Sequence, residues 1–127
     1  MLRGVMTSYP PIEELTWLFE GAPRMEFDDA GWPGCAATWR TVRDGVEVVC
    51  TIEPNGRSVY ITCTSGEGGM VTRIELLDVV ASVSIDRTHG AEALTVTCVD
   101  GGRWEPLRLE LRPRVELRAS ASMRYSG

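Results

Sequence analysis

Short segments in which apolar and polar residues alternate fill most of the chain after residue 46. The clearest pair is Val46–Glu53 and Ser58–Ser65, separated by a loop that contains Asn55-Gly56. Asn-Gly favours a type I′ turn, in which both central residues have positive φ, so the two segments predict a β-hairpin. The register set by a two-residue loop pairs Ile52 with Val59, Cys50 with Ile61 and Val48 with Cys63. These pairs share one wholly apolar face, which we therefore expect to face the core.

Further alternating segments recur at intervals of about 8–12 residues, with turn residues between them, as is typical of an antiparallel meander. A second tight turn is expected at Asp44-Gly45. In the segment 107–112 the alternation places Arg108, Glu110 and Arg112 on the outward face. The expected strands outside the hairpin are Arg24–Asp28, Ala36–Arg43, Val71–Val79, Ala81–Arg87 and Ala93–Val99, followed by alternation at Leu107, Leu109 and Leu111 and again at Val115 and Leu117.

The N-terminal part of the chain carries a helical pattern instead. Apolar residues recur at helical spacing at Ile12, Leu15, Leu18 and Phe19. This spacing predicts an amphipathic helix over about residues 10–20, with Ser8 as a candidate N-cap and Gly21 as a candidate C-cap. A helix of this length does not persist alone in water, so it must dock on the strands.

Together these patterns predict an α+β fold that is mostly β, with one N-terminal amphipathic helix packed on an antiparallel β-meander of about 7–8 short strands. The length of 127 residues fits a single domain, 1–127, with residues 1–9 and 120–127 as loose tails. The pattern leaves open whether the strands close into a barrel, pack as a sandwich or form an open sheet under the helix.

Charge and composition narrow the classes of function. The formal net charge of −5 and the pI near 4.9 argue against general nucleic-acid binding and are compatible with a basic protein partner. No apolar stretch approaches the roughly 20 residues of a membrane helix, and the N-terminus lacks the apolar run of a signal peptide, so we expect a cytoplasmic protein without membrane contact. All 13 basic residues are Arg, which is typical of the coding bias of a GC-rich bacterial genome.

The residues that usually carry catalysis are sparse. His89 is the only histidine, so one chain cannot build a histidine-based triad or a multi-histidine metal site. The four cysteines form no C-x-x-C pair, and three of them fall on apolar strand faces, where a free cysteine packs as a small hydrophobe. We therefore expect no enzyme activity, no metal and no cofactor.

The candidate binding residues cluster between the helix and the second strand. Glu26, Asp28 and Asp29 form the densest acidic group of the chain, suited to a basic protein surface. Trp32 follows in a loop beside Pro33 and Gly34, and tryptophan is enriched in binding hot spots. These four residues, Glu26, Asp28, Asp29 and Trp32, are the predicted partner contacts.

Three stretches carry a likeness to a known group of proteins: the helix end Trp17-Leu18-Phe19-Glu20-Gly21-Ala22-Pro23, the segment 77–85, and the segment 107–113 that ends in Arg112-Pro113. In pattern the chain resembles small bacterial immunity proteins of polymorphic-toxin systems, particularly those that combine a helix with a sheet. Such proteins usually bind one cognate toxin and block its active site. The resemblance therefore implies a non-enzymatic protein that occludes its toxin sterically and electrostatically.

Two alternatives from other classes stay open. The chain could be a small-ligand-binding or hydrolytic β-domain, which a deep pocket holding a Cys or Asp of shifted pKa would favour. It could also be a structural module that associates with itself through an exposed strand edge. The pattern does not distinguish a monomer from an oligomer.

Overall fold

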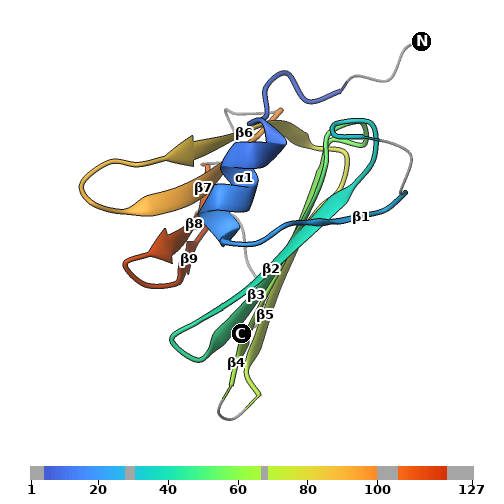
Figure 1. The fold of residues 1–127 in the computed structure, drawn as a ribbon. Coiled ribbons are helices and arrows are strands. Elements are labelled where there is room, and N and C mark those ends of the chain that lie inside the picture. The colour runs from blue at the N-terminus through green and yellow to red at the C-terminus, as the bar shows by residue number, and fades with distance from the viewer. Residues whose placement is uncertain (1–4, 28–30, 67–68, 100–105, 120–127) are drawn as a thin grey trace.

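The computed structural model describes residues 5–27, 31–66, 69–99 and 106–119. The strands found there lie in two antiparallel sheets, sheet 1 in the order β1-β2-β3-β4-β5 and sheet 2 in the order β6-β7-β8-β9. Figure 1 shows α1 (blue) between the strands of the two sheets. The predicted α+β, mostly β class is confirmed. The elements are α1 (Ile12–Phe19), β1 (Arg24–Met25), β2 (Ala37–Arg43), β3 (Val46–Glu53), β4 (Ser58–Ser65), β5 (Val71–Leu76), β6 (Val80–Asp86), β7 (Glu92–Cys98), β8 (Leu107–Arg112) and β9 (Glu116–Arg118).

One core joins the helix and both sheets. Leu15, Leu18 and Phe19 of α1 are buried against sheet 1, where Phe19 stacks on Trp39 with ring centroids 5.7 Å apart. Sheet 2 contributes apolar residues of β6, β7 and β8 to the same cluster. The architecture that the sequence left open is therefore two sheets that share a core with one short helix. The buried strand residues of this core are Ala37, Trp39, Val48, Cys50, Ile52, Val59, Ile61, Ile74, Val80, Val83, Leu94, Val96, Leu107, Leu109 and Leu111.

The β3–β4 hairpin has the predicted register but not the predicted turn. Ile52 lies opposite Val59 and the remaining pairs follow as expected. The positive φ, however, falls on Arg57 (50°) rather than on Asn55 or Gly56, so the type I′ prediction is wrong. Residues 54–57 form a four-residue loop that still leaves the last strand residues paired, which preserves every side-chain face.

The β2–β3 turn does have the two positive φ values that a type I′ turn requires. Asp44 has φ 52° and Gly45 has φ 75°, and they connect the paired residues Arg43 and Val46 directly. The tight turn predicted at Asp44-Gly45 is confirmed. At the other edge of sheet 1, β1 stops at Met25, short of the predicted Asp28, and Phe27 is exposed rather than packed with Met25.

A β-bulge in sheet 2 changes which way Arg112 points. Glu92 lies opposite Arg112, whereas the next residue of β7, Ala93, lies opposite Glu110, so Leu111 is the extra residue. Glu92 shares its face of β7 with Leu94, which is in the core. The prediction that Arg112 shares the outward face of Glu110 is therefore wrong, because the bulge returns Arg112 to the inner face.

The described part of the N-terminal segment is docked between the sheets. The Met6 N–H donates to the Pro54 carbonyl of the β3–β4 loop (3.0 Å), and the Thr7 N–H donates to the Ala81 carbonyl of β6 (2.7 Å). Met6 itself is buried in the core. A loose tail over residues 1–9 is therefore wrong for residues 6–8, while residues 1–4 and 120–127 lie outside the described residues.

The crossing from sheet 1 to sheet 2 is locked to the β3–β4 loop. The Arg57 carbonyl accepts the N–H groups of Val79 (3.1 Å) and Val80 (2.9 Å), and the Arg57 guanidinium lies 3.0 Å from the Asp78 carboxylate. The buried Ser58 hydroxyl accepts the Asp78 N–H at 3.0 Å. These bonds orient the Arg57 carbonyl, which gives a physical reason for the left-handed conformation at this residue.

Candidate functional site

The predicted acidic contact region begins where β1 ends. Glu26 is exposed there, its N–H donates to the Ala36 carbonyl at 2.9 Å, and its carboxylate accepts the Ala36 N–H at 3.4 Å. Asp28 and Asp29 lie outside the described residues. Glu26 is thus held at the edge of sheet 1 by backbone pairing, with its carboxylate close to the solvent face.

Trp32 fastens the loop after β1 to the core. Its indole N–H donates to the Pro10 carbonyl (3.1 Å), and its ring meets Tyr9 and Trp39 edge-on, with centroids 5.8 and 5.6 Å away. The ring is half-buried rather than free-standing, so only part of it is available to a partner. The row from Tyr9 through Trp32 and Trp39 to Phe19 is aromatic throughout, which accounts for two of the four tryptophans.

A hollow of about 440 Å³ brings Glu26 together with a second glutamate that is not among the predicted partner contacts. Glu53 is the last residue of β3 and lines the same hollow, with the small Ala36 between the two carboxylates. We call this feature the acidic hollow, and its lining residues are Arg24, Met25, Glu26, Ala36, Thr38, Thr51 and Glu53. Strand alternation indicates that Glu53 faces outward, but only the pairing of β1, β2 and β3 brings it beside Glu26.

The acidic hollow opens on the face of sheet 1 opposite the helix. α1 packs on the face that holds Trp39, whereas Thr38, the preceding residue of β2, points the other way and joins Thr51 by a hydroxyl–hydroxyl hydrogen bond of 2.8 Å. Farther along this solvent face Arg40 pairs with Glu47. The hollow is therefore part of a broad polar sheet surface that is accessible to a large partner.

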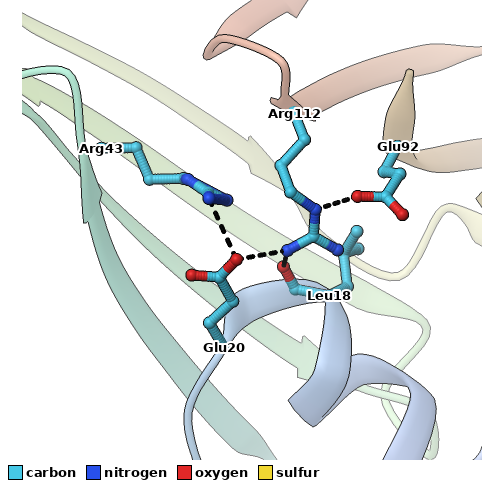
Figure 2. A network of polar contacts seen from close by, with 5 residues as sticks. All are labelled: Leu18, Glu20, Arg43, Glu92 and Arg112. Atoms are coloured by element: carbon cyan, nitrogen blue, oxygen red, sulfur yellow. Dashed lines mark hydrogen bonds and ion pairs between the residues drawn. The ribbon is translucent and has the colours of Figure 1, made fainter. Parts of the chain in front are cut away.

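On the opposite side of sheet 1, a network of charged residues closes the C-terminus of α1 (Figure 2). The Arg112 guanidinium donates to the Leu18 carbonyl (3.2 Å) and to the Glu20 carboxylate (2.7 Å), and it also pairs with Glu92. Arg43 of β2 reaches the same Glu20 oxygen at 2.9 Å. We call this set the helix clamp, because residues of α1, β2, β7 and β8 meet in it.

The clamp explains how the helix ends without the predicted glycine cap. Glu20, not Gly21, is the residue in the left-handed conformation (φ 60°). The last turn of α1 contains no basic residue, yet free carbonyl groups at a helix C-terminus favour a nearby cation. Arg112 supplies that cation from sheet 2. At the other end the N-cap is Pro11 without a side-chain hydrogen bond, so the predicted Ser8 cap is wrong.

Trp17 is the aromatic residue of the helix that faces solvent. It is 43% exposed, and the guanidinium groups of Arg87 and Arg112 lie over its ring, 4.2 and 4.5 Å from the centroid. One nitrogen of Arg112 is buried without a hydrogen-bond acceptor among the described residues, and the electron-rich ring face offers partial compensation. Arg87 also pairs with Glu14 at 3.4 Å, so the exposed side of α1 is held on both flanks.

A second, larger hollow of about 650 Å³ lies on sheet 2 around the single histidine. His89 is exposed in the β6–β7 turn, as the sequence indicates. Asp86 pairs with Arg108, and hydrogen bonds from Thr88 and from Arg108 lower the pKa of the Asp86 carboxyl. A lowered pKa keeps this carboxylate ionised and ill suited to accept a proton near neutral pH.

Three of the four thiols have pKa shifts opposite to those of a nucleophile. Burial raises the pKa of Cys50, with a smaller contribution from neighbouring Cys63, and burial also raises the pKa of Cys63 and Cys98. A nucleophilic thiol needs the opposite shift.

Among the described residues no group of three or more His, Cys, Asp or Glu side chains is placed to hold a metal ion. No helix in the described ranges is long and apolar enough to cross a membrane.

Comparison with known proteins finds a shared fold. The chain is similar to one in the solved structure described as "Contact-dependent growth inhibition toxin - immunity protein complex from Klebsiella pneumoniae 342". The TM-score is 0.77 at 15% sequence identity, and the match covers 92% of this chain and 98% of that one. No protein-family model and no curated protein matches the sequence. The likeness seen in the sequence therefore extends to the fold of a protein from a toxin–immunity complex.

Proposed function

We propose that this chain is a non-enzymatic bacterial immunity protein that binds one cognate toxin in the cytoplasm and blocks its active site. The observation that carries the proposal is the fold shared with a chain of a toxin–immunity complex over 92% of this chain. The pKa shifts are compatible with it, since the raised pKa of Cys50 and Cys63 disfavours those thiols as nucleophiles and the lowered pKa of Asp86 disfavours that carboxylate as a general base.

The acidic hollow and the adjoining loop are the proposed contact region for a basic toxin. Glu26 and Glu53 line one hollow, and Asp28 and Asp29 follow two and three residues after Glu26 in the sequence. Arg24 also lines the hollow, so the excess of negative charge comes from the two glutamates together with Asp28 and Asp29. Such an excess attracts an oppositely charged protein over several ångströms and raises the rate of productive encounter. The half-buried Trp32 is itself fixed by its hydrogen bond to the Pro10 carbonyl, so this side chain loses little conformational entropy on binding.

The first test is capture of the partner. The tagged protein is incubated with lysate of its native cell at low and high salt, and bound proteins are identified by mass spectrometry. The proposal predicts one stoichiometric protein partner whose retention falls as salt rises. Expression of that partner alone should arrest growth, and its co-expression with this chain should restore growth. A captured partner with no toxicity of its own would contradict the immunity role.

Charge reversal then tests the contact region. Glu26→Arg combined with Glu53→Arg, and separately Asp28→Arg combined with Asp29→Arg, should each weaken binding of the captured partner by about tenfold or more at low salt, which corresponds to about 1.4 kcal/mol. Surface plasmon resonance measures the association and dissociation rates. Glu116→Arg on β9 is the matched control, because it reverses a partly exposed acid on sheet 2. Unchanged affinity in both double variants would refute the acidic contact region.

A further inference from the structure

Exposed apolar side chains gather along one strand at the edge of sheet 1. β5 pairs with β4 on one side, and its other side pairs with no strand in the described part of the chain. Met70, Val71, Leu77 and Val79 flank or occupy this strand, and they account for four of the nine large apolar residues found exposed among the described residues. An edge strand with exposed apolar residues is a surface on which another strand can add.

The sequence of β5 is suited to antiparallel pairing with a second copy of itself. If two copies pair with Ile74 opposite Ile74, each residue before Ile74 lies opposite the residue equally far after it in the other copy. Arg73 then lies opposite Glu75 of the second copy, and Val71 lies opposite Leu77. All four of these residues are exposed. Val71, Arg73 and Glu75 lie on the outward face of β5, and Leu77 directly follows the strand. Each charged residue therefore meets its opposite, and each exposed apolar residue meets another.

We propose that two copies of this chain associate through β5, edge to edge and antiparallel, around a two-fold axis at Ile74. Cross-strand pairs of opposite charge and of apolar residues are the interactions that stabilise neighbouring strands. An isologous contact requires self-complementarity, and a pairing with an unrelated strand does not, so the Arg73–Glu75 and Val71–Leu77 matches favour a second copy as the occupant. The pairing involves one short strand, so the dimer is weak and forms as concentration rises.

The dimer leaves the proposed toxin contact accessible. β5 and β1 are the two opposite edges of sheet 1, and the acidic hollow lies at the β1 end. Self-association and toxin binding therefore use separate surfaces, and the proposed dimer does not depend on the proposed function. Loss of the dimer and loss of toxin binding are separate results, obtained with different variants.

Sedimentation equilibrium of the full chain over a wide concentration range tests the proposal. The wild type should shift from monomer to dimer, whereas Arg73→Glu and Glu75→Arg should each stay monomeric, because like charges would then face each other across the axis. An equimolar mixture of these two variants should form a heterodimer, because it restores opposite charges at both positions. The double variant Arg73→Glu/Glu75→Arg should regain the homodimer.

The matched control is Arg40→Glu, which breaks a cross-strand ion pair on the same sheet face but away from β5. It should leave the association unchanged. Circular dichroism melts confirm that each variant is folded. The proposal is overturned if the wild type stays monomeric at the highest concentration reached. It is equally overturned if both single variants dimerise like the wild type, which would place a dimer contact elsewhere.

Discussion

Sheet 1 and sheet 2 are both antiparallel meanders, but only sheet 1 keeps an unbroken register. From β2 to β5 each residue lies opposite the partner that simple alternation requires. Sheet 2 contains two irregularities, one between Val80 and Ser82 and one between Glu92 and Ala93. Alternation therefore assigns side chains to faces reliably until a bulge intervenes. At the second bulge, Arg112 joins Glu20, Glu92 and Arg43 in one network of charges.

The second irregularity is what makes the helix clamp possible. In a regular strand Arg112, two residues after Glu110, would lie on the same outward face as Glu110. With the extra residue Leu111, Arg112 faces Glu92 and reaches the end of α1. The irregular sheet thus performs a task that the regular sheet cannot, because it directs a cation from a strand onto a helix C-terminus.

The largest effect is expected from removal of the bulge-directed cation. Arg112→Ala should lower the free energy of unfolding by about 1–3 kcal/mol, because it leaves Glu92 and the Leu18 carbonyl without their main partner in a half-buried site. Urea unfolding monitored by tryptophan fluorescence measures the change. Arg118→Ala is the control, since its side chain is 68% exposed and should cost less than about 0.5 kcal/mol. Equal effects of the two variants would show that Arg112 stabilises the fold no more than the exposed Arg118 does.

A smaller effect on stability is expected from substitution of the glycines in two hairpin loops of sheet 1. Gly45 has φ 75° with open space around it, so Gly45→Ala should cost about 1 kcal/mol through backbone strain alone. Gly56 lacks a positive φ, and a Cβ there would meet the Glu53 side chain, which can rotate away, so Gly56→Ala should cost about half as much or less. Thermal unfolding of both variants compares them directly. A larger cost at Gly56 than at Gly45 would contradict the expectation that backbone strain at the β2–β3 turn outweighs crowding against Glu53.

The smallest effect concerns the regular part of sheet 2 and appears only as a pH dependence. The folded-state pKa of Asp86 is lowered, so its contribution to stability is present above the unfolded pKa of about 3.9 and is lost as pH falls through the folded value. Asp86→Asn should therefore lower the unfolding midpoint slightly at pH 6–7, with the difference from wild type shrinking in acid below about pH 4. A difference that grows on acidification would contradict the assigned direction.

Local sequence pattern predicted some features of the fold correctly and others wrongly. The β3–β4 register followed from alternation and loop length alone, and it survived an error in the turn type because two-residue and four-residue loops pair the same residues. The helix was correct in place, but its caps were not, since neither Ser8 nor Gly21 plays the part that its residue type favours. Of the two glutamates in the acidic hollow, Glu26 is a predicted partner contact, whereas the place of Glu53 beside it depends on the order of strands across sheet 1.

By itself, the sequence determined the helix, the hairpin register, the inward faces of the strands and the excess of negative charge, because periodicity and composition act over a few neighbouring residues. The tertiary structure alone decided that the strands divide into two sheets, that Glu26 and Glu53 share a hollow, and that Arg43 and Arg112 meet at Glu20. Residues 20 and 112 are 92 positions apart. No local pattern encodes such a contact, since it depends on where a bulge falls and on how the helix and both sheets pack into one core.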